Sequence, residues 1–240
     1  MFYQFNSTNL YYKRVDQGGK TVLLMHGFGA DSKAIDCLFY FLKNRGYSVL
    51  SIDFAGFGQS EEPKSAWSIY DYANSVESLL KHLEITQVVG VGHSFGGRVG
   101  LILASRKLLC ALVIISGAGL KPKRTPLYYA KITTYKIAKS LGIKWANAGS
   151  KDYKNLSENM RATFVKVVNE HLDYLLPTIH IPTLILWGDK DRQTPLYMAK
   201  RLRKNIKNST LFIFEGGHYS YIDCYNDTCL CMENFLCSLE

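Results

Sequence analysis

A serine enclosed by glycines is the first group in this sequence that could act as a nucleophile. Ser94 is the centre of the segment Gly92-His93-Ser94-Phe95-Gly96, which fits the pattern Gly-x-Ser-x-Gly. A short apolar run rich in valine precedes this segment, and a helix-compatible run follows it at once. A strand, a sharp turn and a helix in this order present a serine oxygen above the end of a sheet. Glycine is needed at both flanks because a Cβ there would collide where strand and helix approach each other.

A serine hydroxyl is a weak nucleophile unless a neighbouring base takes its proton and a third group orients that base. We expect His218 to be the base, because it follows the last predicted strand on the glycine-flanked turn Glu215-Gly216-Gly217-His218. The other histidines have less suitable positions. His82 lies late in a helix, His171 and His180 flank the end of the helical block described below, His93 is in the serine turn itself, and His26 is in another loop.

The orienting acid is expected on the turn after the preceding strand, which reads Gly188-Asp189-Lys190-Asp191. We favour Asp191 because it lies further into the loop, and Asp189 is the alternative. The orienting acid could also come from the turn after the strand at 111–115. That turn holds no carboxylate, so this alternative is excluded.

A second glycine-rich loop, His26-Gly27-Phe28-Gly29, follows the buried strand predicted at 21–25. In a serine hydrolase, backbone N–H groups at this place must face the developing oxyanion, and glycine lets the loop approach the substrate.

The elements that position these loops alternate along the first half of the chain. Apolar runs predict strands at 21–25, 47–53, 88–93 and 111–115, and helical periods predict helices at 36–45 and 69–83. Strands return at 181–187 and 211–214, a basic helix ends near 207, and a final helix covers about 221–236. Residues 1–15 are expected to form an antiparallel edge hairpin closed by the turn at 17–20. The prediction is an α/β fold with a doubly wound, mostly parallel sheet of about eight strands.

Residues 120–178 interrupt this alternation and are predicted to form an inserted helical cap, with residues 1–119 and 179–240 as the core. The net charge of the chain is +9, and residues 120–170 alone carry 11 basic and 3 acidic side chains. One helix is expected to begin at the cap residue Ser157. The apolar face of the cap either covers a pocket or packs on the core. The basic surface of the cap either contacts an anionic membrane weakly or is a solvated helical face.

Composition narrows the classes of protein further. The longest apolar run, Leu108 to Ile115, is far too short to span a bilayer, and no signal peptide is recognisable, so a cytoplasmic protein is expected. The 6 cysteines are expected to be reduced thiols, and their spacing matches no zinc site. No cofactor is predicted. Despite the positive charge, no nucleic-acid-binding motif accompanies the lysines, and the oligomeric state is left open.

Together these motifs resemble the α/β-hydrolase fold superfamily over essentially the whole chain: HGFG, DFAGFGQS, GHSFGG, WGDKD and GGH, in that order. The chain order Ser94, Asp191, His218 is the order this superfamily uses. The resemblance implies Ser94 as nucleophile, His218 as general base and acid, and Asp191 as orienting acid. It also implies an oxyanion hole from the backbone N–H groups of Phe28 and Phe95. Relatives that open epoxides or displace halide use aspartate at the elbow, so Ser94 argues against those reactions.

The function predicted from the sequence is that of a serine hydrolase, carboxylesterase- or lipase-like, acting on a small-molecule ester with an apolar acyl or alkyl part. Hydrolysis of a carbon–carbon bond in a diketone-like substrate, or of a thioester, is the alternative, because the same triad serves all of them. A ligand receptor or scaffold without activity is a second alternative. The residues expected to line the substrate pocket are His26, Gly27, His93, Tyr128 and Tyr219.

Overall fold

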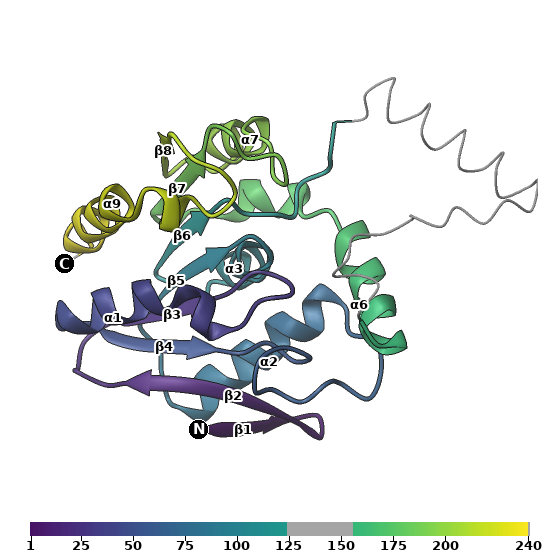
Figure 1. Ribbon diagram of the computed structural model, residues 1–240. Coiled ribbons are helices and arrows are strands. Elements are labelled where there is room, and N and C mark those ends of the chain that lie inside the picture. The colour runs from purple at the N-terminus through teal and green to yellow at the C-terminus, as the bar shows by residue number, and fades with distance from the viewer. Residues whose placement is uncertain (124–155, 240) are drawn as a thin grey trace, which may run out of the picture.

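The computed structural model describes residues 1–123 and 156–239, in which eight strands form one sheet (Figure 1). The strands lie in the order β1-β2-β4-β3-β5-β6-β7-β8 across the sheet. Their bounds are β1 Phe2–Phe5, β2 Thr8–Val15, β3 Thr21–Met25, β4 Ser48–Ile52, β5 Val88–His93, β6 Ala111–Ile115, β7 Thr183–Gly188 and β8 Ser209–Phe214. The predicted α/β fold with a mostly parallel sheet is confirmed.

The sheet is parallel from β4 to β8, and β1 and β2 are antiparallel at its edge. The prediction of an edge hairpin is confirmed, but the turn that closes it was misplaced. Asn6 and Ser7 close the hairpin with φ values of 47° and 61°. Two left-handed residues between paired strands match the twist of an antiparallel hairpin. The turn at 17–20 instead leads from β2 into β3.

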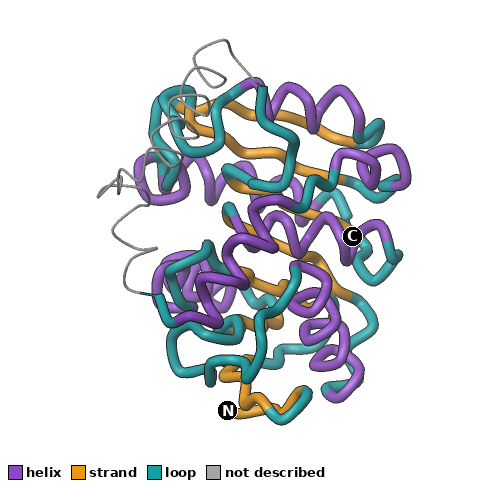
Figure 2. Tube along the Cα trace, turned by 90° about the vertical axis from the view of Figure 1, so that its right-hand side faces the viewer, coloured by secondary structure: helices purple, strands orange, loops and turns teal. Residues whose placement is uncertain are grey.

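Helices cover both faces of the sheet (Figures 1 and 2). Their bounds are α1 Asp36–Asn44, α2 Ile69–His82, α3 Phe95–Ser105, α6 Glu158–Asn169, α7 Tyr197–Asn205, α8 Ser220–Asp223 and α9 Tyr225–Cys237, with 3₁₀ turns at Ser32–Ile35 and Asp173–Thr178. Helices α1 and α9 pack on one face, and α2, α3 and α7 on the other. In β3, Leu23 and Met25 join one core and Val22 and Leu24 the other, because alternate side chains of a strand point to opposite faces.

The predicted final helix is divided in the structure. Helix α8 ends at Asp223, and α9 starts at Tyr225, with Cys224 between them at φ −125° and ψ 52°. This residue is outside the helical region, so one helix could not continue through it. All 6 cysteines are free thiols.

The region predicted as a cap is described only from residue 156 onward. Ser157 caps α6 as expected, because its side chain accepts a hydrogen bond from Met160 N. The expected helix around Tyr128 and most of the basic residues of 120–170 lie outside the described residues. Within 1–123 and 156–239, no helix is long and apolar enough to cross a membrane.

The carboxyl ends of the parallel strands bring four separate loops to one edge of the sheet. Strand β3 leads into His26, β5 into Ser94, β7 toward Asp191 and β8 toward His218. Ligands of open α/β sheets bind at this edge.

Candidate active site

Ser94 lies on a strained turn between β5 and α3. Its φ of 50° and ψ of −105° fall outside the regions that residues with a side chain usually adopt. The surrounding structure fixes this turn, because Ser94 N donates to Ile115 O at 3.1 Å and Ser94 O accepts from Ala118 N at 2.9 Å. A Cβ at Gly96 would overlap Met25 O, so only glycine permits this approach of α3 to β3. The segment therefore has the geometry of a nucleophile elbow.

His218 lies next to Asp191 on the neighbouring loop. Its Nδ1 is 2.9 Å from Asp191 Oδ2, and both side chains are buried. An ionised carboxylate only accepts hydrogen bonds, so Nδ1 carries the proton and Nε2 is left with a free lone pair. This tautomer is the one that a base needs in order to take a proton from a serine.

Asp191 is held by three further hydrogen bonds. Its Oδ1 accepts from Gln193 N at 2.8 Å and from Thr194 N at 2.9 Å, and its Oδ2 accepts from Thr194 Oγ1 at 2.7 Å. Burial favours a raised pKa for Asp191, but the bonds from His218 and Thr194 outweigh it and lower the pKa to about 2. Asp189 is exposed and bonds instead to Gly216 N at 3.1 Å. Of the two candidate acids, the structure joins Asp191 to the histidine.

Behind His218, His93 fixes the backbone of the histidine loop. His93 Nε2 is 3.0 Å from His218 O, and a carbonyl oxygen can only accept, so Nε2 carries the proton of the neutral ring. Burial is the main cause that lowers the pKa of His93 to about 4, and the neighbouring His218 adds to the effect. The ring therefore stays neutral at physiological pH and acts as a fixed support.

The residues predicted to line the pocket lie beside the cavity at Ser94 and not in its wall. His26 is fully buried, accepts from Phe54 N at 3.0 Å through Nε2 and donates to Gly27 O at 2.7 Å through Nδ1. It ties two loops together, and burial lowers its pKa. Tyr219 is 46% exposed and packs its ring against His93. His26, Gly27, His93 and Tyr219 are thus absent from the cavity wall, and Tyr128 lies outside the described residues.

The cavity above Ser94 has a volume of about 490 Å³. Its wall consists mostly of apolar side chains from the glycine-rich loop, the elbow and α6, together with two polar residues: Phe28, Ser94, Phe95, Ala118, Leu156, Phe164, Val167, Val168, Arg98 and Gln193. Sequence reasoning missed Arg98 and Gln193. The position of Arg98 one helical turn after Ser94 was a signal that could have found it.

The sequence predicts an oxyanion hole from the backbone amides of Phe28 and Phe95. Phe28 and Phe95 both line the cavity beside Ser94, and their rings pack 5.6 Å apart. The described part of the chain supplies no acceptor for the amide of either residue. The next amide, Gly96 N, is occupied by His26 O at 3.0 Å. Unpaired amides at this place are available to stabilise a negatively charged oxygen.

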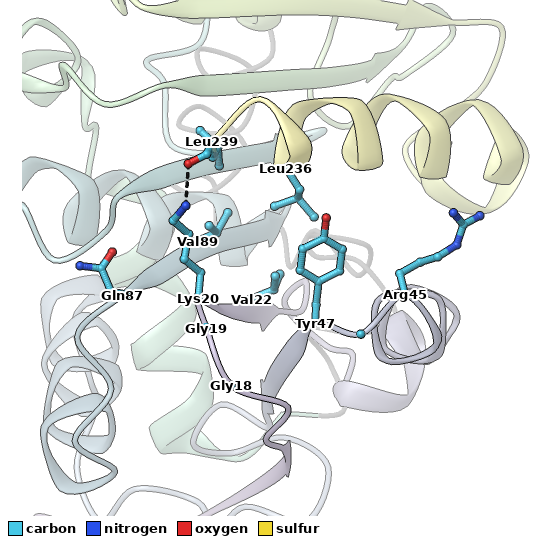
Figure 3. Close-up of a pocket in the computed structure, with 11 residues that line it drawn as sticks. Gly18, Gly19, Lys20, Val22, Arg45, Tyr47, Gln87, Val89, Leu236 and Leu239 are labelled. Atoms are coloured by element: carbon cyan, nitrogen blue, oxygen red, sulfur yellow. Dashed lines mark hydrogen bonds between the residues drawn. The ribbon is translucent and has the colours of Figure 1, made fainter.

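A larger hollow of about 670 Å³ lies at the opposite edge of the sheet, where β3 and β5 begin (Figure 3). Its described wall holds Lys20, whose Nζ donates to Leu239 O, and Arg45, but no serine, cysteine, histidine or carboxylate. Although this hollow is larger, its described wall holds none of the side chains that could form a serine, histidine and carboxylate triad. In addition, no three His, Cys, Asp or Glu side chains among the described residues form a group able to hold a metal ion.

The alpha/beta hydrolase fold model matches residues 20–132. The chain is 26% identical to the uncharacterized hydrolase YugF of Bacillus subtilis over 89% of each chain. It is also 26% identical to a 2-hydroxy-6-oxononadienedioate/2-hydroxy-6-oxononatrienedioate hydrolase of Pseudomonas putida, over 88% of this chain and 85% of that one.

Among solved structures, the esterase EaEST from Exiguobacterium antarcticum superposes with a TM-score of 0.79 at 21% identity, over 98% of each chain. At this identity the likeness concerns the fold alone. The sheet order, the elbow after β5 and the two sequence relatives agree with it. The matched family model, the sequence relatives and the fold together support the assignment of this chain to the α/β-hydrolase fold superfamily.

Proposed function

We propose that the chain is a serine hydrolase that cleaves a carboxylic ester through an acyl-enzyme on Ser94. The observation that carries this proposal is the hydrogen bond between His218 Nδ1 and Asp191 Oδ2. The loop of His218 is joined to the elbow by the bond from His93 Nε2 to His218 O, and the elbow serine lines an apolar cavity. A histidine oriented by a carboxylate is what activates a serine hydroxyl.

In the proposed reaction, Ser94 Oγ attacks the ester carbonyl while His218 Nε2 takes the hydroxyl proton. The amides of Phe28 and Phe95 bind the oxyanion of the tetrahedral intermediate, and loss of one such donor typically costs about 10²- to 10³-fold in rate. His218 then gives its proton to the departing alcohol. Water, activated by the same histidine, hydrolyses the acyl-enzyme and restores Ser94.

The apolar cavity wall supports an ester with an apolar acyl part, since most of the lining side chains are aromatic or aliphatic. The carbon–carbon bond hydrolase is kept as the second candidate, because one relative is named as a hydrolase of 2-hydroxy-6-oxononadienedioate, a keto-dicarboxylate whose name contains no ester. Both reactions need the same nucleophile and base, so geometry does not separate them.

The test is a panel of 4-nitrophenyl acyl esters, an acyl thioester and a vinylogous diketone, assayed with the wild type and with Ser94→Ala. Ester hydrolysis that is lost in Ser94→Ala is the expected result. Ser51→Ala is the matched control, since Ser51 is a buried serine in β4 whose hydroxyl has no partner among the described residues. Turnover of the diketone with no ester hydrolysed would favour the second candidate. Catalysis unchanged in Ser94→Ala would contradict both.

A further inference from the structure

Arg98 is the one cationic side chain in the described wall of the cavity above Ser94. It lies on α3 four residues after Ser94, and both residues line this cavity. The other side chains of this wall, apart from Ser94 and neutral Gln193, are apolar. A group bound covalently at Ser94 and extending along the cavity therefore passes within reach of Arg98.

The guanidinium of Arg98 is buried and only partly satisfied. The side chain is 8% exposed, and its Nη1 donates to Val167 O and to Glu170 O, each at 2.8 Å. No acceptor for Nε or Nη2 exists within the described residues, and neither atom is fully enclosed. Two donors of a buried cation are thus left for a partner other than the described protein atoms.

Among the described residues, no carboxylate forms an ion pair with Arg98. Glu170 favours the charged form of Arg98, but no Asp or Glu of the described residues lies within 4 Å of the guanidinium. Burial lowers the pKa of Arg98 to about 10, so the side chain remains a cation at neutral pH. An unpaired buried cation is costly, and an anion from outside the chain would remove that cost.

We propose that the cavity accepts an ester whose acyl chain ends in a carboxylate, and that Arg98 binds this carboxylate while the ester carbonyl lies at Ser94. This inference rests on the proposed function and specifies its substrate class. A single carboxylate matches the single cation of the wall, whereas a phosphate dianion would leave one buried charge uncompensated. The planar guanidinium also offers two parallel N–H groups to a carboxylate. The apolar wall accommodates the methylene groups between the two ends.

A different role for Arg98 must be separated from this one. The two carbonyls that it binds lie at the end of α6, so Arg98 also holds this helix in place. Loss of that contact alone would impair every substrate equally. Only a carboxylate-binding role makes the effect depend on the charge of the acyl chain.

The test compares kcat/KM for the 4-nitrophenyl half-ester of adipate with that for 4-nitrophenyl heptanoate, a neutral ester of similar length. We expect the wild type to prefer the half-ester by about 10- to 100-fold, the range for a hydrogen bond between charged groups. Arg98→Met should abolish this preference, and Arg98→Lys should retain part of it. Arg106→Met is the matched control, because Arg106 lies at the far end of α3 and pairs with Glu77. It should leave both rates unchanged.

Binding is measured separately so that the inference does not depend on turnover. Isothermal titration calorimetry with the Ser94→Ala protein should show methyl hydrogen adipate binding about 10- to 100-fold more tightly than methyl heptanoate. In the double variant Ser94→Ala, Arg98→Met, the two methyl esters should bind with similar affinity.

Equal binding of the two methyl esters, or an equal loss of both rates in Arg98→Met, would overturn the inference. If Arg98→Met does not fold, the wild-type ester pair and Arg98→Lys still decide. The wild type could hydrolyse 4-nitrophenyl heptanoate in a Ser94-dependent way but show no preference for the half-ester. That result would refute this inference and leave the proposed function intact. No Ser94-dependent hydrolysis of any ester would instead refute the proposed function.

Discussion

Replacement of Asp191 by asparagine tests whether this carboxylate orients the proposed base. The structure determines how the new amide must lie. Two backbone amides, Gln193 N and Thr194 N, both donate to Oδ1, so the asparagine oxygen has to occupy that position. Its NH₂ group then replaces Oδ2 and faces His218 Nδ1. Because an NH₂ group donates, Nδ1 must become the acceptor, and the proton moves to Nε2.

This tautomer cannot accept the proton of Ser94. In serine proteases, the same exchange lowers kcat by about 10⁴-fold while the geometry is kept. We expect a loss of about 10³- to 10⁴-fold here. The melting temperature should change little, since asparagine has the shape of aspartate and keeps both backbone hydrogen bonds.

The assay is kcat/KM for a 4-nitrophenyl ester at neutral pH, with thermal unfolding followed by circular dichroism. Asp189→Asn is the control, because Asp189 is exposed and bonds to Gly216 N but not to the histidine. It should stay within about threefold of the wild type, the range of a surface substitution. An Asp191→Asn protein within tenfold of wild-type activity, or an equal loss in Asp189→Asn, would refute the reasoning.

Three further predictions concern the elbow, the supporting histidine and the basic segment. Gly96→Ala should lower the free energy of unfolding by at least about 3 kcal/mol, because the new Cβ overlaps Met25 O. Denaturation by urea measures this change. An unchanged urea midpoint would contradict the close contact between Gly96 and Met25. The free energy of unfolding of the wild type should fall as the pH is lowered from 6.5 to 4, because there the unfolded chain binds a proton at His93 that the native ring, with its pKa of about 4, does not. His93 should account for about 3 kcal/mol of this fall. In urea titrations, the free energy of unfolding of His93→Gln should therefore change less with pH than that of the wild type. Equal pH dependence in the two proteins would contradict the assigned burial of His93. For the basic residues of 120–170, co-sedimentation with phosphatidylserine liposomes should decrease at high salt, and binding indifferent to anionic lipid would remove the predicted membrane contact.

The fold was accessible from the sequence because its strands are short apolar runs separated by glycine-rich turns. The run Ala111–Ile115 is a strand with the predicted bounds, since all its side chains are buried between two layers of helices. The hairpin turn was misplaced because Asn6-Ser7 is a less conspicuous turn pair than Gln17-Gly18-Gly19-Lys20. Glycine indicates where a turn is permitted, but pairing of the strands decides which turn closes the hairpin.

The shared location of Ser94, Asp191 and His218 could be predicted because each follows a strand end, and parallel strands have their carboxyl ends at one edge of the sheet. The pocket wall could not be predicted in this way. His26 is next to the glycine-rich loop in sequence, yet its ring turns inward to Phe54 N. Phe164 and Val167 come from α6, far along the chain, and which face of that helix lies over Ser94 is decided by tertiary packing. Side-chain direction at such positions depends on contacts that no local pattern records.

The central claim is that Ser94 forms a covalent acyl intermediate, and labelling with an active-site fluorophosphonate tests it most directly. Intact-mass spectrometry of the wild type should show one added phosphonyl group, which peptide mapping assigns to Ser94. Ser94→Ala should remain unlabelled, while Ser51→Ala should be labelled like the wild type. A wild-type protein that takes up no label at Ser94, or a Ser94→Ala protein labelled at the same peptide, would contradict the account.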